Sequence, residues 1–317
     1  MPDLSVLLLR ALKSLSLGEN TMERTVQMKL LDALEQMRGV VSSFYEKYAR
    51  NGVISLTELT KSGKYKELEN RITGLLEPAL TKGVKGIHNF LPIQYEEAFL
   101  RTTWALDTSL GVHLGLKVPS SSEIASIFDS NNPQNIYVSE ALFNFPIEAR
   151  KNTRKALMNG IYMGKSMNSM YKDLGTAVSM AYSKTKLIVG TENTGAINHG
   201  IEEAFKRALE NGVSGKIIWS TRNDDKVRPA SKYEKGDHRE MEGQVRDEEG
   251  LFHLHRTGET APFPGWQGLS PEQRINCRCR QILIVDGYDP TKNKGDTEKI
   301  DKFMGFETWR QKYYGGK

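Results

Sequence analysis

A seam of apolar side chains between residues 30 and 48 most constrains how this 317-residue chain can fold. Its members follow one another at steps of four, three, four, three and four residues: Leu30, Leu34, Met37, Val41, Phe44 and Tyr48. Such steps place the side chains on one face of a helix, in a seam that suits packing against a partner helix. The pattern predicts a helix over residues 20–50, ended by Asn51-Gly52.

The rest of the first two thirds is also predicted to be helical. Helical spacing of apolar residues indicates helices over residues 4–17, 64–76 and 94–112, the second ending before Pro78. Further helices are expected over residues 146–159 and, ended by Asn211-Gly212, 176–211. The turn-forming stretch Ser130-Asn131-Asn132-Pro133 predicts a domain boundary.

The character of the chain changes after residue 214. Residues 216–220 are β-prone, and residues 281–285 are typical of a buried strand. We therefore predict an α+β protein with a helical N-terminal half followed by a small α+β module with a few strands. The expected domains are a helical, compact or extended docking domain (1–130), a helical lead-in (131–214), the α+β module (215–286) and a polar C-terminal tail that docks or frays (287–317).

Composition excludes some classes of protein. The 44 Lys and Arg exceed the 39 Asp and Glu by only five, which permits contact with nucleic acid without requiring it. Two cysteines do not make a disulfide framework, and a reducing cytoplasm suits them. No apolar run reaches the roughly 18 residues that a membrane span needs. The sequence contains no Walker loop, no strand-linked GxGxxG motif and no HExxH motif.

Cys277 and Cys279 are the first candidates for chemistry. On a strand, residues two apart face the same side, so both thiols would point together. Two thiolates can bind a soft metal such as zinc, with His238 and one of His253 or His255 completing four ligands. The alternative is a pair of small buried thiols that pack without a metal.

Charged residues offer two further hypotheses. Asp224 and Asp225 could act with His238 and the cysteine pair in a metal-dependent nuclease or hydrolase, or they could simply cap a turn beside Arg228. Three arginines near the end of the module could meet DNA phosphates: Arg274, Arg278 and Arg280. Alternatively, Arg278 and Arg280 pair with the two aspartates and hold the module together.

The order of several motifs in residues 146–286 resembles the head morphogenesis family typified by the F protein of phage Mu. A Thr-Glu pair in a helix, Thr191-Glu192, comes first. The elements that follow it are Trp219, then Asp224, Asp225 and Arg228 in a polar turn, then His238 with Gly243 five residues later, and finally Asn276, Cys277, Arg278 and Cys279. The chain differs from the family in a longer segment between Arg228 and His238 and in Val189-Gly190 before the Thr-Glu pair.

The resemblance implies a minor capsid protein of a tailed bacteriophage and not a stand-alone enzyme. It implies association with the portal protein at the DNA-packaging vertex, a role in procapsid assembly, and a role in DNA retention or ejection. Further partners expected are the major capsid or scaffold protein and phage DNA, but no membrane. The expected location is the capsid interior near the portal vertex, after assembly in the host cytoplasm. A metal-dependent hydrolase and a DNA-binding protein are the alternatives.

Overall fold

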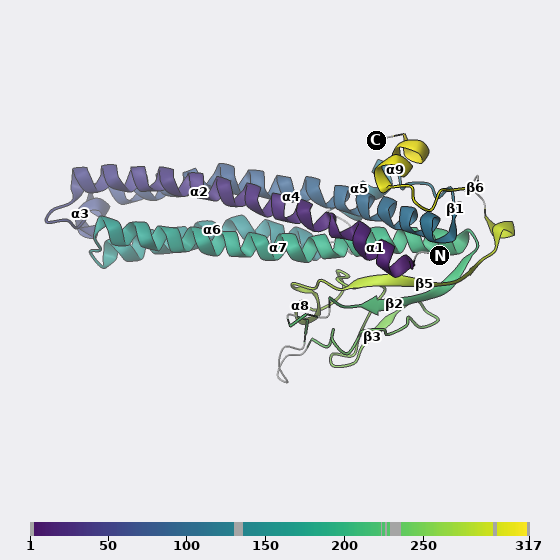
Figure 1. Ribbon diagram of the computed structural model, residues 1–317. Coiled ribbons are helices and arrows are strands. Elements are labelled where there is room, and N and C mark those ends of the chain that lie inside the picture. Colours follow the sequence, from purple (N-terminus) through teal and green to yellow (C-terminus); the bar gives the residue numbers. More distant parts are fainter. Residues whose placement is uncertain are drawn as a thin grey trace. The chain divides into compact units, whose positions relative to one another are not determined.

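The chain consists mainly of long helices, and its described strands, apart from the two-residue β1, lie in its last third (Figure 1). The computed structural model describes residues 3–129, 136–222, 224–225, 227–228, 236–293 and 297–315. Its helices are α1 (Leu4–Lys13), α2 (Leu15–Tyr48), α3 (Leu56–Lys61), α4 (Lys64–Leu110), α5 (Ser121–Ile127), α6 (Ile136–Tyr162), α7 (Met167–Glu210), α8 (Pro271–Arg274) and α9 (Phe306–Tyr314). Its strands are β1 (Val112–His113), β2 (Val213–Ser220), β3 (Phe252–Leu254), β4 (Glu259–Ala261), β5 (Arg280–Tyr288) and β6 (Glu298–Lys299), with a 3-10 turn, η2 (Pro290–Lys292). The predicted α+β class is confirmed.

The apolar seam lies on α2, and the predicted helix is confirmed. Its first five members, residues 30, 34, 37, 41 and 44, are buried. Helices of the same chain cover this region: the Arg71 guanidinium of α4 lies 5.7 Å from the Phe44 ring centroid, and the Tyr45 hydroxyl donates to the Lys165 carbonyl at 2.6 Å. The seam therefore packs within the chain and is not free to dock on a portal or scaffold protein.

Helix α4 corrects the prediction of two separate helices. It runs unbroken for 47 residues through Pro78 and Pro92, where the sequence analysis ended one helix and placed a gap. An interior proline removes a backbone hydrogen bond and costs about 3 kcal/mol. Leu76 and Leu80 on either side of the first proline are fully buried, as is Leu91 beside the second. Burial of these side chains offsets the cost of the prolines. Helix α7 begins at Met167, before the start predicted at residue 176, and continues through Gly175, Gly190 and Gly195.

The chain divides into two compact units. Unit 1 comprises Met1–Glu19, Asn89–Tyr137 and Gly190–Lys317, and unit 2 comprises Asn20–His88 and Val138–Val189. In unit 2, parts of α2, α4, α6 and α7 lie side by side (Figure 1). The domain boundaries predicted at residues 214 and 286 stay predictions. The two compact units are separated at points inside the long helices, for example between Val189 and Gly190 in α7. The boundary predicted at Ser130–Pro133 lies outside the described residues.

Unit 1 contains the strands. Strand β2 pairs antiparallel with β5 from Val213 opposite Tyr288 to Ser220 opposite Arg280, with an irregular step between Ser214 and Gly215. In the described residues, β3 pairs with β4 and β1 with β6, each also antiparallel. The strands predicted at residues 216–220 and 281–285 are confirmed within β2 and β5. None of the described helices is long and apolar enough to cross a membrane.

The end of the chain packs on α4 through a buried carboxylate. Asp107 is fully buried, and its Oδ2 accepts from Trp309 Nε1 at 2.9 Å. The same oxygen lies 2.6 Å from His113 Nδ1, and Oδ1 accepts from the Leu114 amide at 2.9 Å. His113 in turn stacks on Tyr313, with ring centroids 3.8 Å apart. The C-terminal tail is therefore docked on its own chain and does not fray at α9.

We expect Trp309→Ala to destabilise unit 1 strongly. The indole is fully buried, and its loss leaves a cavity and a buried carboxylate with one donor fewer. The free energy of unfolding should fall by about 3–5 kcal/mol in urea denaturation. Phe303→Ala is the matched control, because Phe303 lies in the same tail but is 95% exposed. Equal effects of the two changes would contradict a docked C-terminus.

Candidate metal centre

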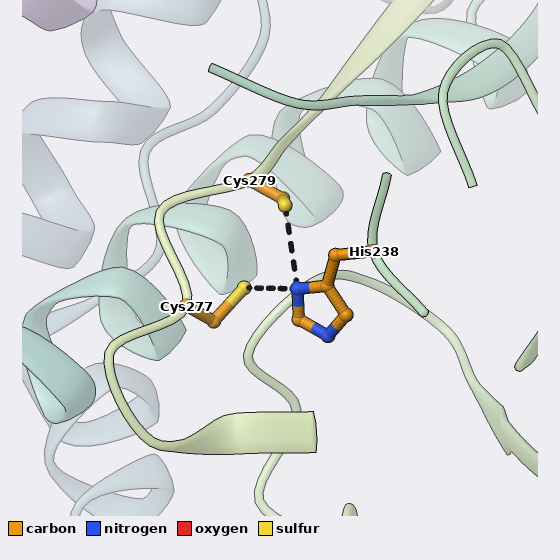
Figure 2. A group of neighbouring side chains, drawn as sticks. All are labelled: His238, Cys277 and Cys279. Atoms are coloured by element: carbon orange, nitrogen blue, oxygen red, sulfur yellow. Dashed lines mark hydrogen bonds between the residues drawn. The ribbon is translucent and has the colours of Figure 1, made fainter. Parts of the chain in front are cut away.

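Three buried side chains with metal-binding atoms meet in unit 1 (Figure 2). His238 Nδ1 lies 3.5 Å from Cys277 Sγ and 3.5 Å from Cys279 Sγ. Figure 2 shows the imidazole facing both sulfur atoms, which come from a loop just before β5. The three donor atoms lie within 4.8 Å of one another, and each residue is no more than 2% exposed. The grouping expected from sequence is therefore present.

Helix α7 positions the loop that carries the cysteines, residues 275–279, hereafter the cysteine loop. Three polar side chains of α7 bond its backbone. Thr191 Oγ1 accepts from the Asn276 amide at 3.1 Å. Thr194 Oγ1 donates to the carbonyl of the first cysteine at 2.6 Å, and Asn198 Nδ2 donates to that of the second at 2.9 Å. The loop is thus fixed by bonds that do not involve the thiols, so the thiols are held together before any ligand binds.

A buried ion pair secures the start of the cysteine loop. Arg274, at the end of α8, pairs with Glu192 of α7, and the two side chains are 7% and 3% exposed. Removing one partner of such a pair leaves an uncompensated buried charge. Asn276, two residues further on, has a φ of 56°, in the left-handed region that asparagine tolerates better than most residues. The Thr-Glu motif of α7 therefore contacts the segment that carries the Asn-Cys-Arg-Cys motif: Thr191 bonds Asn276, and Glu192 pairs with Arg274.

A tight turn presents the histidine to the thiols. The Met241 amide donates to the His238 carbonyl at 3.2 Å, and the Gly243 amide donates to the Trp219 carbonyl at 2.8 Å. Gly243 has a φ of 76°, which explains a glycine at this position. The Trp219 ring meets the imidazole edge to face, with centroids 5.2 Å apart. The tryptophan, histidine and glycine of the motif thus form one structural unit.

The two thiols differ in acidity. Burial opposes ionisation of Cys277, but the neighbouring thiol of Cys279 and the His238 imidazole lower the pKa of Cys277 well below its usual value. The hydrogen bond with Cys277, together with burial, raises the pKa of Cys279 well above its usual value. One thiolate therefore forms readily in this group, and a thiolate is the form that binds metal.

A small pocket adjoins the three side chains. Besides them, its lining residues are Arg222, Val227, Arg228, Asn276 and Arg278. Asp224 makes a two-pronged ion pair with Arg278, at 2.7 Å for each contact. Arg228 donates to the backbone carbonyls of Glu272 and Gln273. The pairing of Arg278 with an aspartate is therefore confirmed, whereas Arg280 donates to the Cys279 carbonyl.

Other residues singled out from sequence lie elsewhere. His253 and His255 do not complete the group: His253 Nε2 contacts Asp247 at 2.6 Å, and His255 Nε2 contacts Gln244 at 3.2 Å. The expected fourth ligand from this pair is therefore wrong. Asp225 is exposed and, among the described residues, no carboxylate joins the metal-binding group. A nuclease site built on both aspartates thus has no support in the described residues.

The three arginines proposed for DNA all have contacts within the module. Arg274 pairs with Glu192, Arg278 with Asp224, and Arg280 Nη1 donates to the Cys279 carbonyl at 3.1 Å. Arg280 is half-buried, and burial lowers the pKa of its guanidinium. Their contact with DNA stays a prediction, which these contacts do not favour.

Sequence reasoning missed the supporting residues Thr194, Asn198 and Asp237. The buried Asp237 accepts from the Arg256 amide at 3.0 Å and from Gln273 Nε2 at 2.9 Å, beside the histidine. A signal for the first two existed: Thr191, Thr194 and Asn198 are spaced three and four apart and share one face of α7. A polar stripe on an otherwise buried helix indicates bonding to a neighbouring backbone.

Comparison with known proteins identifies the module. Residues 151–282 match the family described as "Phage Mu protein F like protein". The chain is 19% identical over 298 residues to "Minor head protein GP7" of Bacillus phage SPP1, which covers 91% of this chain and 92% of that protein. It is 22% identical over 241 residues to "NAD(+)--arginine ADP-ribosyltransferase EFV" of Enterococcus faecalis (strain ATCC 700802 / V583), which covers 76% of this chain but only 47% of that protein. No solved structure matches the chain.

The cysteine–histidine group thus lies in a segment that is similar to proteins of the phage Mu F class. The match of residues 151–282 to the Phage Mu protein F like protein family confirms the resemblance drawn from the sequence. The family match ends inside β5 and includes all three side chains of the candidate metal centre.

Proposed function

We propose that this chain is a minor head protein of a tailed bacteriophage that binds the portal protein and acts in procapsid assembly. The observation that carries this proposal is its similarity to a minor head protein over nearly the full length of both chains. The relative named as an ADP-ribosyltransferase is matched over less than half of its own length, so the similarity supports no transferase activity for this chain. The proposed location is the capsid interior near the portal vertex.

Incorporation into procapsids tests this role. We expect the chain to be present in procapsids assembled with the phage's own portal protein and absent from those assembled without it. Quantitative mass spectrometry of purified procapsids measures both, with the major capsid protein as the internal reference. Equal amounts in the two preparations would show that the portal protein does not recruit the chain.

Contact with DNA is the second part of the proposal, and the distribution of charge supports it. Unit 2 has 19 Lys and Arg against 11 Asp and Glu, a net charge of +8. Unit 1 has 25 against 28, a net charge of −3. On α6, Lys151 and Lys155 are exposed and lie one turn apart on the same face. We place the DNA contact on unit 2, where it would serve DNA retention or ejection.

We expect the double variant K151E/K155E to bind duplex DNA more weakly and with less dependence on salt. Each lost phosphate contact lowers the slope of log affinity against log salt by about 0.9, so two should lower it by about 2. Fluorescence anisotropy at several salt concentrations measures the slope. Lys206→Glu is the control, since Lys206 is exposed on α7 in unit 1. An equal effect of this control would refute a contact confined to unit 2.

The third part of the proposal is a soft metal ion, zinc, at His238, Cys277 and Cys279. Two thiolates and an imidazole are ligands that zinc prefers, and the three donors already converge on one point. Fixed in this way, the ion would join the turn that carries the histidine to the cysteine loop. Its part would be to stabilise the module.

We expect the purified chain to contain about one zinc per chain. Cys277→Ser should lower that content several-fold, because it removes one of three ligands, and elemental analysis by mass spectrometry measures it. His253→Ala is the control, since this histidine lies in the same unit but outside the group. Zinc retained by both variants would show that the metal is bound somewhere else.

A further inference from the structure

The candidate metal centre supplies three ligands, whereas zinc is almost always bound by four. Among the described residues, no further histidine, cysteine or carboxylate joins His238, Cys277 and Cys279. Structural zinc sites are usually closed by a fourth protein ligand, whereas sites with three protein ligands keep an open position for solvent or another small molecule. The number of donors therefore distinguishes the two kinds of site.

The fourth position has a place in the structure. The pocket that adjoins the group is lined by all three donor residues and is partly open, which gives a small ligand from solvent access to an ion held there. Of the other described residues that line it, Val227 has no side-chain donor atom, and three are arginines, which remain protonated and cannot bind a metal. The remaining one, Asn276, has only an amide oxygen, and amides are not among the usual zinc ligands.

The charges around the pocket select the kind of ligand. A zinc ion with two thiolates and a neutral imidazole has no net charge. Among the described residues, Arg222, Arg228 and Arg278 add three positive charges to the lining, and Asp224 pairs with Arg278. A site of this sign favours an anionic donor over a neutral one.

We infer that the metal proposed at His238, Cys277 and Cys279 keeps an open fourth coordination position that takes a small anion from solvent. The inference rests on the proposed metal and concerns only what completes its coordination. It assigns the site to the open class of metal centres, in which an exchangeable ligand meets the ion, and not to the closed class that serves only as a cross-link.

Cobalt(II) tests the inference, because its visible spectrum reports both the ligands and their number. The full chain is stripped of metal, loaded with Co²⁺ and titrated with azide. We expect sulfur-to-cobalt bands that weaken in Cys277→Ser and disappear in the double variant C277S/C279S, and d–d bands that shift saturably as azide binds. Bands that require the cysteines but do not respond to azide would mean that the chain closes its own site, and would overturn the inference while leaving the metal in place. No cysteine-dependent bands at all would overturn the proposed metal and the inference together.

Arg222→Ala tests the role of charge without touching a ligand. Arg222 is exposed at its position and lines the pocket. We expect an unchanged cobalt spectrum and a roughly fivefold weaker affinity for azide, the size expected for losing one partly screened charge near the ion. An unchanged affinity would contradict the selection of anions by the arginines. Lys216→Ala, an exposed cation on β2 outside the pocket lining, is the matched control and should change neither quantity.

Discussion

The bonds from α7 to the backbone of the cysteine loop determine the rest of the module. Two threonines and an asparagine on one face of the helix bond the loop at three successive points, and the Glu192–Arg274 pair holds its start. With the loop fixed, the thiols face the histidine, and β5 begins in register with β2. These contacts are made by side chains on a rigid helix, so the geometry of the thiols does not depend on a bound ion.

Much of this was open to prediction from the sequence. The strands and the seam follow from local periodicity, and the grouping of His238 with two cysteines follows from their chemistry. The predictions that failed concern features that depend on burial by distant parts of the chain. Proline normally ends a helix, yet α4 continues because its neighbours are buried. The hydrogen bond from Trp309 to Asp107 could not be predicted from the sequence, because Asp107 lies 202 residues earlier in the chain. Three histidines were candidate ligands from the sequence, and of these His238 lies beside the two cysteines in the structure.

A structural role and a metal-binding group are compatible. The similarity to a minor head protein extends over nearly the whole chain, while the metal-binding group occupies only a small part of unit 1. The opposite net charges of the two units agree with the proposed division of roles, in which the basic unit 2 would meet DNA while internal ion pairs hold the loops of the module in unit 1. Arg274 and Arg278, which the sequence offered as DNA contacts, form ion pairs with Glu192 and Asp224 inside the module.

The composition of unit 1 has a consequence for the order of folding during synthesis. Unit 2 is built from residues 20–88 and 138–189, so it can close before the ribosome has added residues 190–317. Unit 1 joins residues 1–19 to residues 190–317, and Trp309 lies in its core. Because domains fold as their residues emerge, α1 lacks its contacts with β5 until residues 280–288 have been made. A chain that terminates early would therefore present a folded unit 2 with an unfinished unit 1, a form that chaperones and proteases recognise.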